Sequence, residues 1–202
     1  YFRLSSIWKT RADGTQSQAV CRTTELSGQG AWSPNGTIVF TGLSQPLRKV
    51  PASGGEPEPL SKLDEPELRH SWPQFLPDGD HFLYTSIGAN ASDSTVYLSS
   101  LSNPAIRKPL FKAHSRALFH NLGGDGGLIV YQGDVSMLAV PFSLSSFSVV
   151  GDPFSAGPSV AFNGQFGYGW TMSYYYRIRP LSNGGALVIS GEDGRKDEFT
   201  YS

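Results

Sequence analysis

Histidines, serines and carboxylates are the side chains through which this chain could do chemistry, and their spacing limits what they can do. The four histidines stand at positions 70, 81, 114 and 120. None has the two- or four-residue spacing that puts two metal ligands on one element. No Gly-x-Ser-x-Gly nucleophile elbow occurs. The sequence therefore predicts no metal and no cofactor, and it leaves the catalytic residues unknown.

Glycoside hydrolysis needs two carboxyl groups that face each other across a channel. The candidates are Asp64, Glu65, Glu67, Asp78, Asp93 and Asp125. Asp78 and Asp125 each precede a glycine, where turn chemistry explains them, and we interpret residues 64–67 as a solvated loop. Hydrolysis of a glycan or peptide through channel-facing carboxylates such as Asp64 or Glu67 is the second of two function hypotheses.

Aromatic side chains supply the candidates for ligand binding. His70 and Trp72 lead into a predicted strand, and a Gly- and aromatic-rich stretch follows residue 157. Trp72 could instead wedge between repeats, and the later aromatics could cover an open sheet edge. The predicted ligand-binding set is His70, Trp72, Tyr168, Trp170, Tyr174 and Tyr175.

A recurring turn block shows which elements must position these residues. Its copies centre on Gly36, Gly79, Gly126 and Gly184, which are 43, 47 and 58 residues apart. In the first two copies, Pro precedes an Asn-Gly or Asp-Gly pair, which supplies the positive φ of a tight hairpin. A β-branched and aromatic run follows each copy. The block therefore predicts a repeated hairpin.

A second hairpin interleaves with the first, so each period holds four strands in about 43 residues, the size of a propeller blade. Few charged residues, 16%, and many turn formers, 23 Gly and 14 Pro, fit short strands. The predicted fold is an all-β propeller of about four to five four-stranded antiparallel blades, and a β-sandwich is the alternative. The single domain, 1–202, would hold blades at about 1–30 (partial), 31–72, 73–117, 118–156 and 157–202 (irregular).

The repeat blocks resemble the WD40-like (PD40) repeat of TolB-like propellers. Residues 48–60 and 70–84 are similar to the C-terminal propellers of bacterial eukaryotic-like serine/threonine protein kinases. The resemblance covers residues 7–155. It implies an extracytoplasmic (periplasmic or cell-surface) sensor domain, cut from a longer protein. No kinase motif occurs in this chain, so kinase activity does not carry over.

Charge and hydropathy narrow the class of partner. A net charge of -1 argues against nucleic acid, because phosphate binding needs a basic face. No apolar run is long enough to be a membrane segment. Cys21 is the single cysteine and cannot pair within the chain. The first function hypothesis is therefore a non-catalytic domain that binds a protein, peptide or glycan, with open blade edges available for homo-oligomers.

Overall fold

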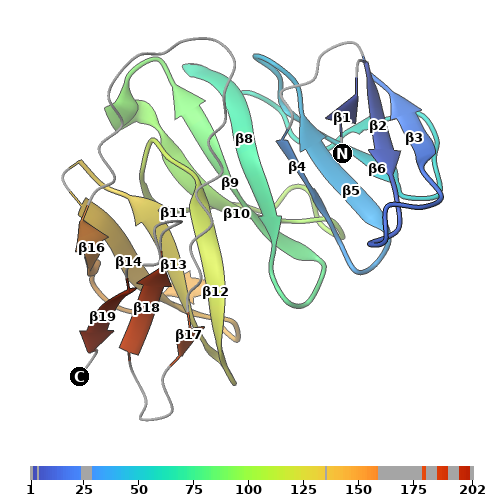
Figure 1. Ribbon diagram of the computed structural model, residues 1–202. Helices are drawn as coiled ribbons and strands as arrows, with labels where there is room; N and C mark the ends of the chain where they lie inside the picture. Colours follow the sequence, from blue (N-terminus) through green and yellow to red (C-terminus); the bar gives the residue numbers. More distant parts are fainter. Residues whose placement is uncertain are drawn as a thin grey trace. The chain divides into compact units, whose positions relative to one another are not determined.

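The computed structural model describes residues 2–3, 5–23, 29–134, 136–158, 179–180, 186–190 and 196–200. The chain divides into two compact units, Tyr1–Phe119 and His120–Ser202, and each is considered by itself. Strands dominate both units (Figure 1). Within the described ranges, the helical structure is limited to one 3-10 turn, Ala91–Asp93.

Three antiparallel sheets make up the first unit, and in each the strand order follows the chain. The first has β1 (Phe2–Arg3), β2 (Ser6–Lys9) and β3 (Gln18–Arg22); the second has β4 (Gln29–Trp32), β5 (Thr37–Thr41), β6 (Leu47–Pro51) and β7 (Glu58–Pro59); the third has β8 (Glu67–Phe75), β9 (His81–Gly88), β10 (Thr95–Ser100) and β11 (Arg107–Lys112). Such up-and-down sheets are typical of propeller blades.

The β5 strand is buried on both faces because its side chains alternate between two cores. Ile38 and Phe40 pack with residues of the first sheet, including Ile7 and Cys21. Val39, on the opposite face, belongs to a second cluster with members from the third sheet. That cluster contains Val39, Leu47, Leu60, Phe82 and Tyr84. The second sheet is thus held between its two neighbours by apolar contacts.

Turn residues of the repeat also join neighbouring sheets. Gly79 turns the chain from β8 into β9 at φ +70°. Its carbonyl oxygen accepts hydrogen bonds from Ser33 Oγ at 2.5 Å and from Asn35 Nδ2 at 3.3 Å. A Cβ at position 79 would come within 3.1 Å of that Asn35 nitrogen. The position therefore requires glycine both for its backbone angle and for the approach of the preceding turn.

Two repeats each contain the same set of hydrogen bonds to an aspartate, which we call the aspartate clasp. Asp80 accepts hydrogen bonds from Ser100 Oγ at 2.6 Å and from the Ser102 backbone at 2.8 Å. Asp125 accepts a bond of 2.8 Å from Ser143 Oγ and a second from the backbone of Ser145. In both, the aspartate before β9 or β13 fastens the end of a later strand.

The second unit continues the pattern. Its strands are β12 (Ala117–Gly123, which begins in the first unit), β13 (Gly126–Gln132), β14 (Ser136–Ser143), β15 (Ser148–Val149) and β16 (Phe154–Pro158), followed by β17 (Arg179–Pro180), β18 (Ala186–Ser190) and β19 (Lys196–Thr200). Strands β12 to β16 form one sheet, in which β14 pairs with β15 through Phe142 and with β16 through Ala139. Leu128, Val130 and Ala156 form its core with Ala139.

The predicted all-β class and its four-stranded antiparallel sheets are confirmed, with hairpins at the Asn35-Gly36 and Asp78-Gly79 turns. The number of blades stays a prediction. One part of the sequence interpretation is wrong. Glu67 belongs to β8, with its side chain 11% exposed, and not to a solvated loop. Asp64 in the same run is exposed at 63%.

Candidate functional site

A polar cluster surrounds His70, the first of the predicted ligand-binding residues. His70 lies on β8 and is completely buried. Its Nδ1 is 2.7 Å from Ser61 Oγ, and its Nε2 is 3.2 Å from Glu67 Oε2. Because a carboxylate only accepts hydrogen bonds, Nε2 carries the ring proton. The backbone of His70 is also held in place, because its carbonyl oxygen accepts a 2.7 Å hydrogen bond from Thr41 Oγ1.

Glu67 is held as an anion within this cluster. Ser86 Oγ donates to its carboxylate at 2.5 Å, the Asp64 backbone N–H donates at 2.9 Å, and Arg107 forms an ion pair with it. Burial alone would raise the pKa of Glu67. These hydrogen bonds, with the charge of Arg107, outweigh burial and hold the pKa below its usual value. A carboxyl that stays ionised cannot serve as a general acid near neutral pH.

Arg107 joins the cluster to two tyrosines. Its Nε donates to the Tyr84 hydroxyl at 3.1 Å, and its guanidinium lies 4.4 Å from the centre of the Tyr97 ring. The Tyr84 and Tyr97 rings stack at 5.6 Å. Burial is the main cause that raises the pKa of Tyr84 to about 12, so this hydroxyl stays neutral. The guanidinium is thus fixed by an ion pair, a hydrogen bond and a cation–π contact.

The hydrogen-bonded side chains of Ser61, His70 and Glu67 are of the types found in a Ser-His-acid triad. Their surroundings, however, differ from those of an active site. Ser61 Oγ already accepts a 2.8 Å bond from the Leu47 backbone N–H. Burial lowers the pKa of His70, and the attraction of Glu67 offsets this only in part. A nucleophile must also be reachable by its substrate. With His70 buried, the cluster stabilises the first unit, and ligand contact by His70 stays a prediction.

Trp72, the second predicted ligand-binding residue, lies in an irregular part of β8. The register with β9 shifts between Ser71 and Gln74, and Trp72 has a positive φ of 56°. Its backbone N–H donates to Gln29 Oε1 at 3.0 Å. Positive φ at a bulky residue is strained and is concentrated at functional sites. The half-buried indole of Trp72 therefore stays a candidate. The remaining four predicted residues, Tyr168, Trp170, Tyr174 and Tyr175, lie outside the described residues.

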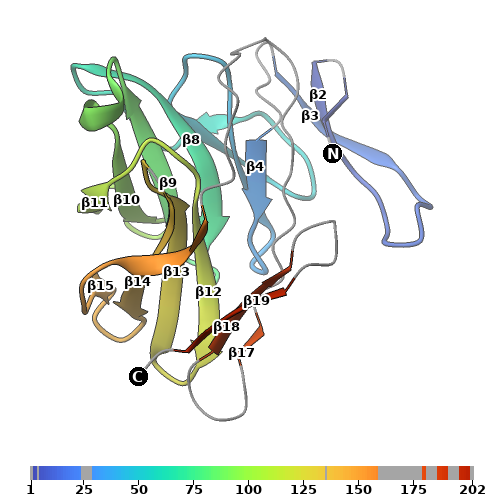
Figure 2. The ribbon, with the colours of Figure 1, turned by 60° about the vertical axis from the view of Figure 1, so that its left-hand side comes forward.

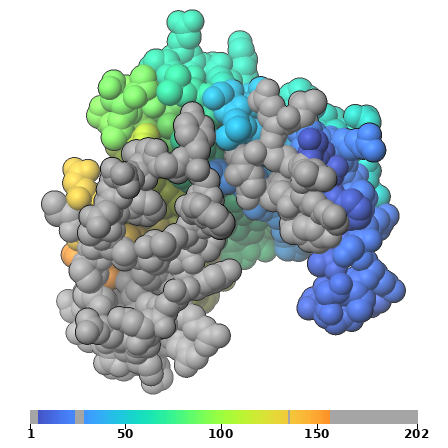
Figure 3. All heavy atoms as spheres, turned by 45° about the horizontal axis from the view of Figure 1, so that its top comes forward, coloured from blue at the N-terminus to red at the C-terminus, as the bar shows by residue number. Residues whose placement is uncertain are grey.

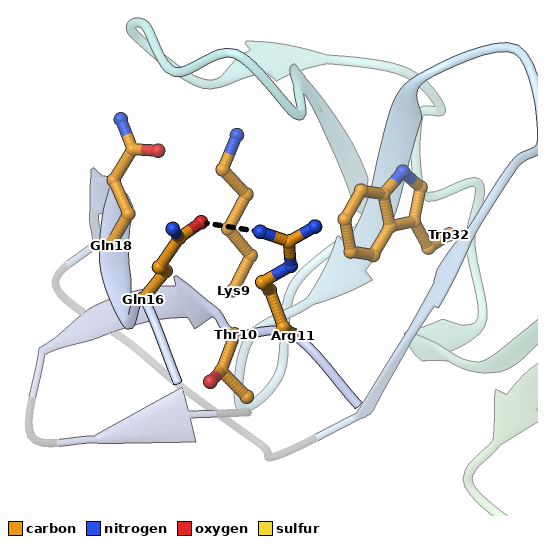
Figure 4. Close-up of a pocket in the computed structure, with 6 residues that line it drawn as sticks. All are labelled: Lys9, Thr10, Arg11, Gln16, Gln18 and Trp32. Atoms are coloured by element: carbon orange, nitrogen blue, oxygen red, sulfur yellow. Dashed lines mark hydrogen bonds between the residues drawn. The ribbon is translucent and has the colours of Figure 1, made fainter. Parts of the chain in front are cut away.

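A surface hollow of ≈ 310 Å³ lies in the first unit between the β2–β3 hairpin and strand β4. Figure 2 shows the β2–β3 hairpin to one side of strand β4, and Figure 3 shows this hairpin at the surface, in blue. Figure 4 shows the Arg11 guanidinium between Gln16 and the Trp32 ring. The lining residues are Lys9, Thr10, Arg11, Gln16, Gln18 and Trp32.

The register of the strands explains why Trp32 faces this hollow. Trp32 pairs with Ile38 across β4 and β5, so their side chains share one face. Ile38 packs against the first sheet. Trp32 therefore points to the same neighbour, but the residue is 54% exposed. Lys9 crosses from the first sheet to the second, where its Nζ donates to the Ala52 carbonyl oxygen at 2.8 Å.

The hairpin turn fixes the other wall. Arg11 Nη1 donates to Gln16 Oε1 at 3.2 Å, and the Arg11 backbone N–H donates to the Thr15 carbonyl oxygen at 3.0 Å. Asp13, at the tip, accepts bonds from the backbone and hydroxyl of Thr15 at 2.9 and 2.6 Å. Within the described ranges, no carboxylate forms an ion pair with Lys9 or Arg11. The hollow is therefore cationic.

Sequence reasoning missed this hollow because its residues come from two sheets. Trp32 precedes the Ser-Pro-Asn-Gly turn and is part of the repeat block. Phe75 has the same place in the next copy and packs against a core, so the repeat gave no signal that Trp32 is exposed. Among the described residues, no group of His, Cys, Asp or Glu is placed to hold a metal. Nor does any helix in those ranges have the length and apolarity to cross a membrane.

Comparisons with known proteins match this fold and no sequence family. No protein-family model matches the chain, and no curated protein matches its sequence. The computationally designed Ika4 protein matches in structure with a TM-score of 0.52 and 12% identity, over 92% of this chain and 99% of its own. Puromycin hydrolase matches with a TM-score of 0.57 and 13% identity, over 98% of this chain and 35% of its own. The chain thus spans about a third of that hydrolase. At such low identity these likenesses show a fold, and the antiparallel sheets show it to be propeller-like.

Proposed function

We propose that this chain is a non-catalytic binding domain whose ligand occupies the hollow beside Trp32. The observation that carries the proposal is the meeting of an exposed indole with two cations, Lys9 and Arg11, that no described carboxylate pairs. An aromatic face with a few convergent polar groups is the usual composition of a ligand site. The ligand would be an anion.

The buried cluster supports a binding role over a catalytic one. His70 has both a serine and a carboxylate in hydrogen-bond reach. Its burial leaves no approach for a substrate, so this constellation stabilises the fold. A site that binds without reacting needs only the preformed hollow.

A ligand screen by thermal shift, with the hits measured by calorimetry, tests the proposal. Anionic ligands should stabilise the wild-type chain, because a ligand that binds only the folded state raises the melting temperature. The double variant K9Q/R11Q should lose this response while it still unfolds cooperatively, with a lower melting temperature in the absence of ligand because the Lys9 bond to Ala52 is lost. Retained responses in the double variant would place the ligand elsewhere.

Hydrolysis through carboxylates such as Asp64 or Glu67 is the second candidate, and the likeness to puromycin hydrolase favours it. Chromogenic glycosides, esters and puromycin itself are the substrates to assay. Turnover that E67Q abolishes, in folded protein, would establish this candidate in place of the first.

The wider context is proposed from the sequence resemblance of residues 7–155. The domain would be the sensor or interaction part of a larger bacterial protein, exposed outside the cytoplasm. Proteolysis of whole cells, with the full-length protein detected by antibody, tests the location. Light scattering of the purified chain tests whether open sheet edges pair two copies, since a dimer should appear at twice the monomer mass.

A further inference from the structure

We infer that the hollow beside Trp32 binds an acidic saccharide, one whose rings carry carboxylates. The inference rests on the proposed function, since it names the ligand class for the same hollow. It draws on three features of the lining: the exposed indole face, the two cations, and the uncharged amides.

The indole face suits a sugar ring. Trp32 is 54% exposed, although its strand partner Ile38 is buried at 7%. An aromatic face left in solvent beside a core has a large apolar area to cover. The C–H face of a pyranose is flat and apolar enough to cover it without a deep pocket, and the shallow hollow of ≈ 310 Å³ could take a short saccharide.

The two cations select a saccharide that carries negative charge. Arg11 presents a planar donor fork, and its bond to Gln16 holds the guanidinium facing Trp32 (Figure 4). Lys9 adds a point charge, and its bond to the Ala52 carbonyl oxygen uses only one of three ammonium donors. Carboxylates are the acceptors that such donors bind most strongly.

The amide side chain of Gln18 is compatible with a saccharide, because it has both a donor and an acceptor and a sugar hydroxyl can satisfy both. A peptide backbone also offers an N–H donor and a carbonyl acceptor, so the preference for a saccharide rests on the flat, exposed indole face of Trp32. The hairpin turn that presents these groups is already braced, by Asp13 and Thr15, so little order has to be gained on binding.

Calorimetry with a galacturonate tetramer tests the assignment, with its methyl ester as the matched uncharged ligand. The acid should bind, and the ester should bind more weakly. R11Q should weaken binding of the acid about twofold to fivefold, the effect expected for one exposed charge pair. W32A should weaken binding of the acid and of the ester alike, roughly twofold to tenfold. R22Q, an exposed arginine of β3 outside the hollow, should leave both affinities unchanged.

Hexaglutamate and inorganic phosphate, as further probes, separate failure of this inference from failure of the proposed function. Equal binding of acid and ester, or no effect of W32A, would overturn the saccharide assignment. Binding of hexaglutamate or phosphate in an R11Q-sensitive manner, without binding of the tetramer, would overturn it while leaving a binding domain at this hollow. Binding by none of the probes also overturns it, and the wider ligand screen then decides the proposed function.

Discussion

Ser33 donates a 2.5 Å hydrogen bond to the carbonyl oxygen of Gly79, a residue 46 positions later in the chain. The bond joins corresponding turns of two neighbouring repeats. In this pair of repeats, the turn that forms one hairpin also docks against the next turn.

Replacing this glycine should destabilise the first unit. G79A meets both the positive φ of +70° and the contact with Asn35, whereas G36A meets only its φ of +84°, with nothing within 4 Å of the added Cβ. A non-glycine residue at such angles costs about 1–2 kcal/mol. We expect G36A to lower the free energy of unfolding by about that amount and G79A by more. Urea unfolding measures both, and equal losses would mean that turn docking contributes nothing.

Removing the carboxylate of Glu67 should be far more costly than removing an exposed one. E67Q leaves the partly buried Arg107 without its main counter-charge, and the loss of one partner of a buried pair costs about 3–5 kcal/mol. Because Arg107 is 24% exposed and keeps Asp64, we expect about 2–3 kcal/mol. The matched control is E58Q, whose pair with Lys49 spans 3.8 Å with Glu58 70% exposed. It should change stability by less than about 1 kcal/mol.

Stability should fall as the pH falls, first through His70. Its pKa in the folded chain lies below 6.5, because burial disfavours the charged ring. The unfolded chain takes up a proton near pH 6.5 while the folded one does not, so acidification favours unfolding. The pKa of Glu67 in the folded chain lies below 4.5, so its contribution is lost as the pH falls below 4.5.

H70Q isolates the first of these two steps. Between pH 7.5 and pH 5, the free energy of unfolding of H70Q should decline less steeply than that of wild type. Burial also lowers the pKa of His120, so some slope should remain. Chemical denaturation at several pH values gives both curves. Parallel curves would show that His70 titrates alike in the folded and unfolded chains.

The aspartate clasps offer a paired substitution in two repeats. D80N removes a charged acceptor of Ser100 and Ser102, and should lower the free energy of unfolding by about 1 kcal/mol. D125N alters the same contacts to Ser143 and Ser145, and should act in the same direction with a smaller effect, because Asp125 is in solvent. Thermal unfolding followed by circular dichroism measures each, and an unchanged melting temperature in D80N would rule out a stabilising clasp.

Local chemistry made the strands predictable from the sequence. The Asn35-Gly36 and Asp78-Gly79 pairs need positive φ at glycine, and β-branched runs follow them, so hairpins were found where expected. Residues 64–67 carried only a local signal of charge and proline. Nothing in that run indicates Arg107, 40 residues beyond Glu67, which draws the carboxylate into the interior.

The hollow beside Trp32 was beyond the reach of sequence reasoning for a related reason. Its two cations come from the β2–β3 hairpin, and its indole comes from the next sheet. Their meeting depends on how two sheets stack, which no local pattern encodes. His70 and Trp72 illustrate the converse, since their types suggested a ligand site and burial assigned His70 to the interior.

The two-sided strand β5 makes the second sheet a shared wall between two cores. Ile38 and Phe40 pack on one side and Val39 packs on the other, so the strand contributes to both cores. Loss of the first sheet would expose the side of the second sheet that carries Ile38 and Phe40, and it would leave the core around Val39 intact. The first unit should therefore unfold from its outer sheets inward. Strand β5 should be the last to exchange its amide hydrogens.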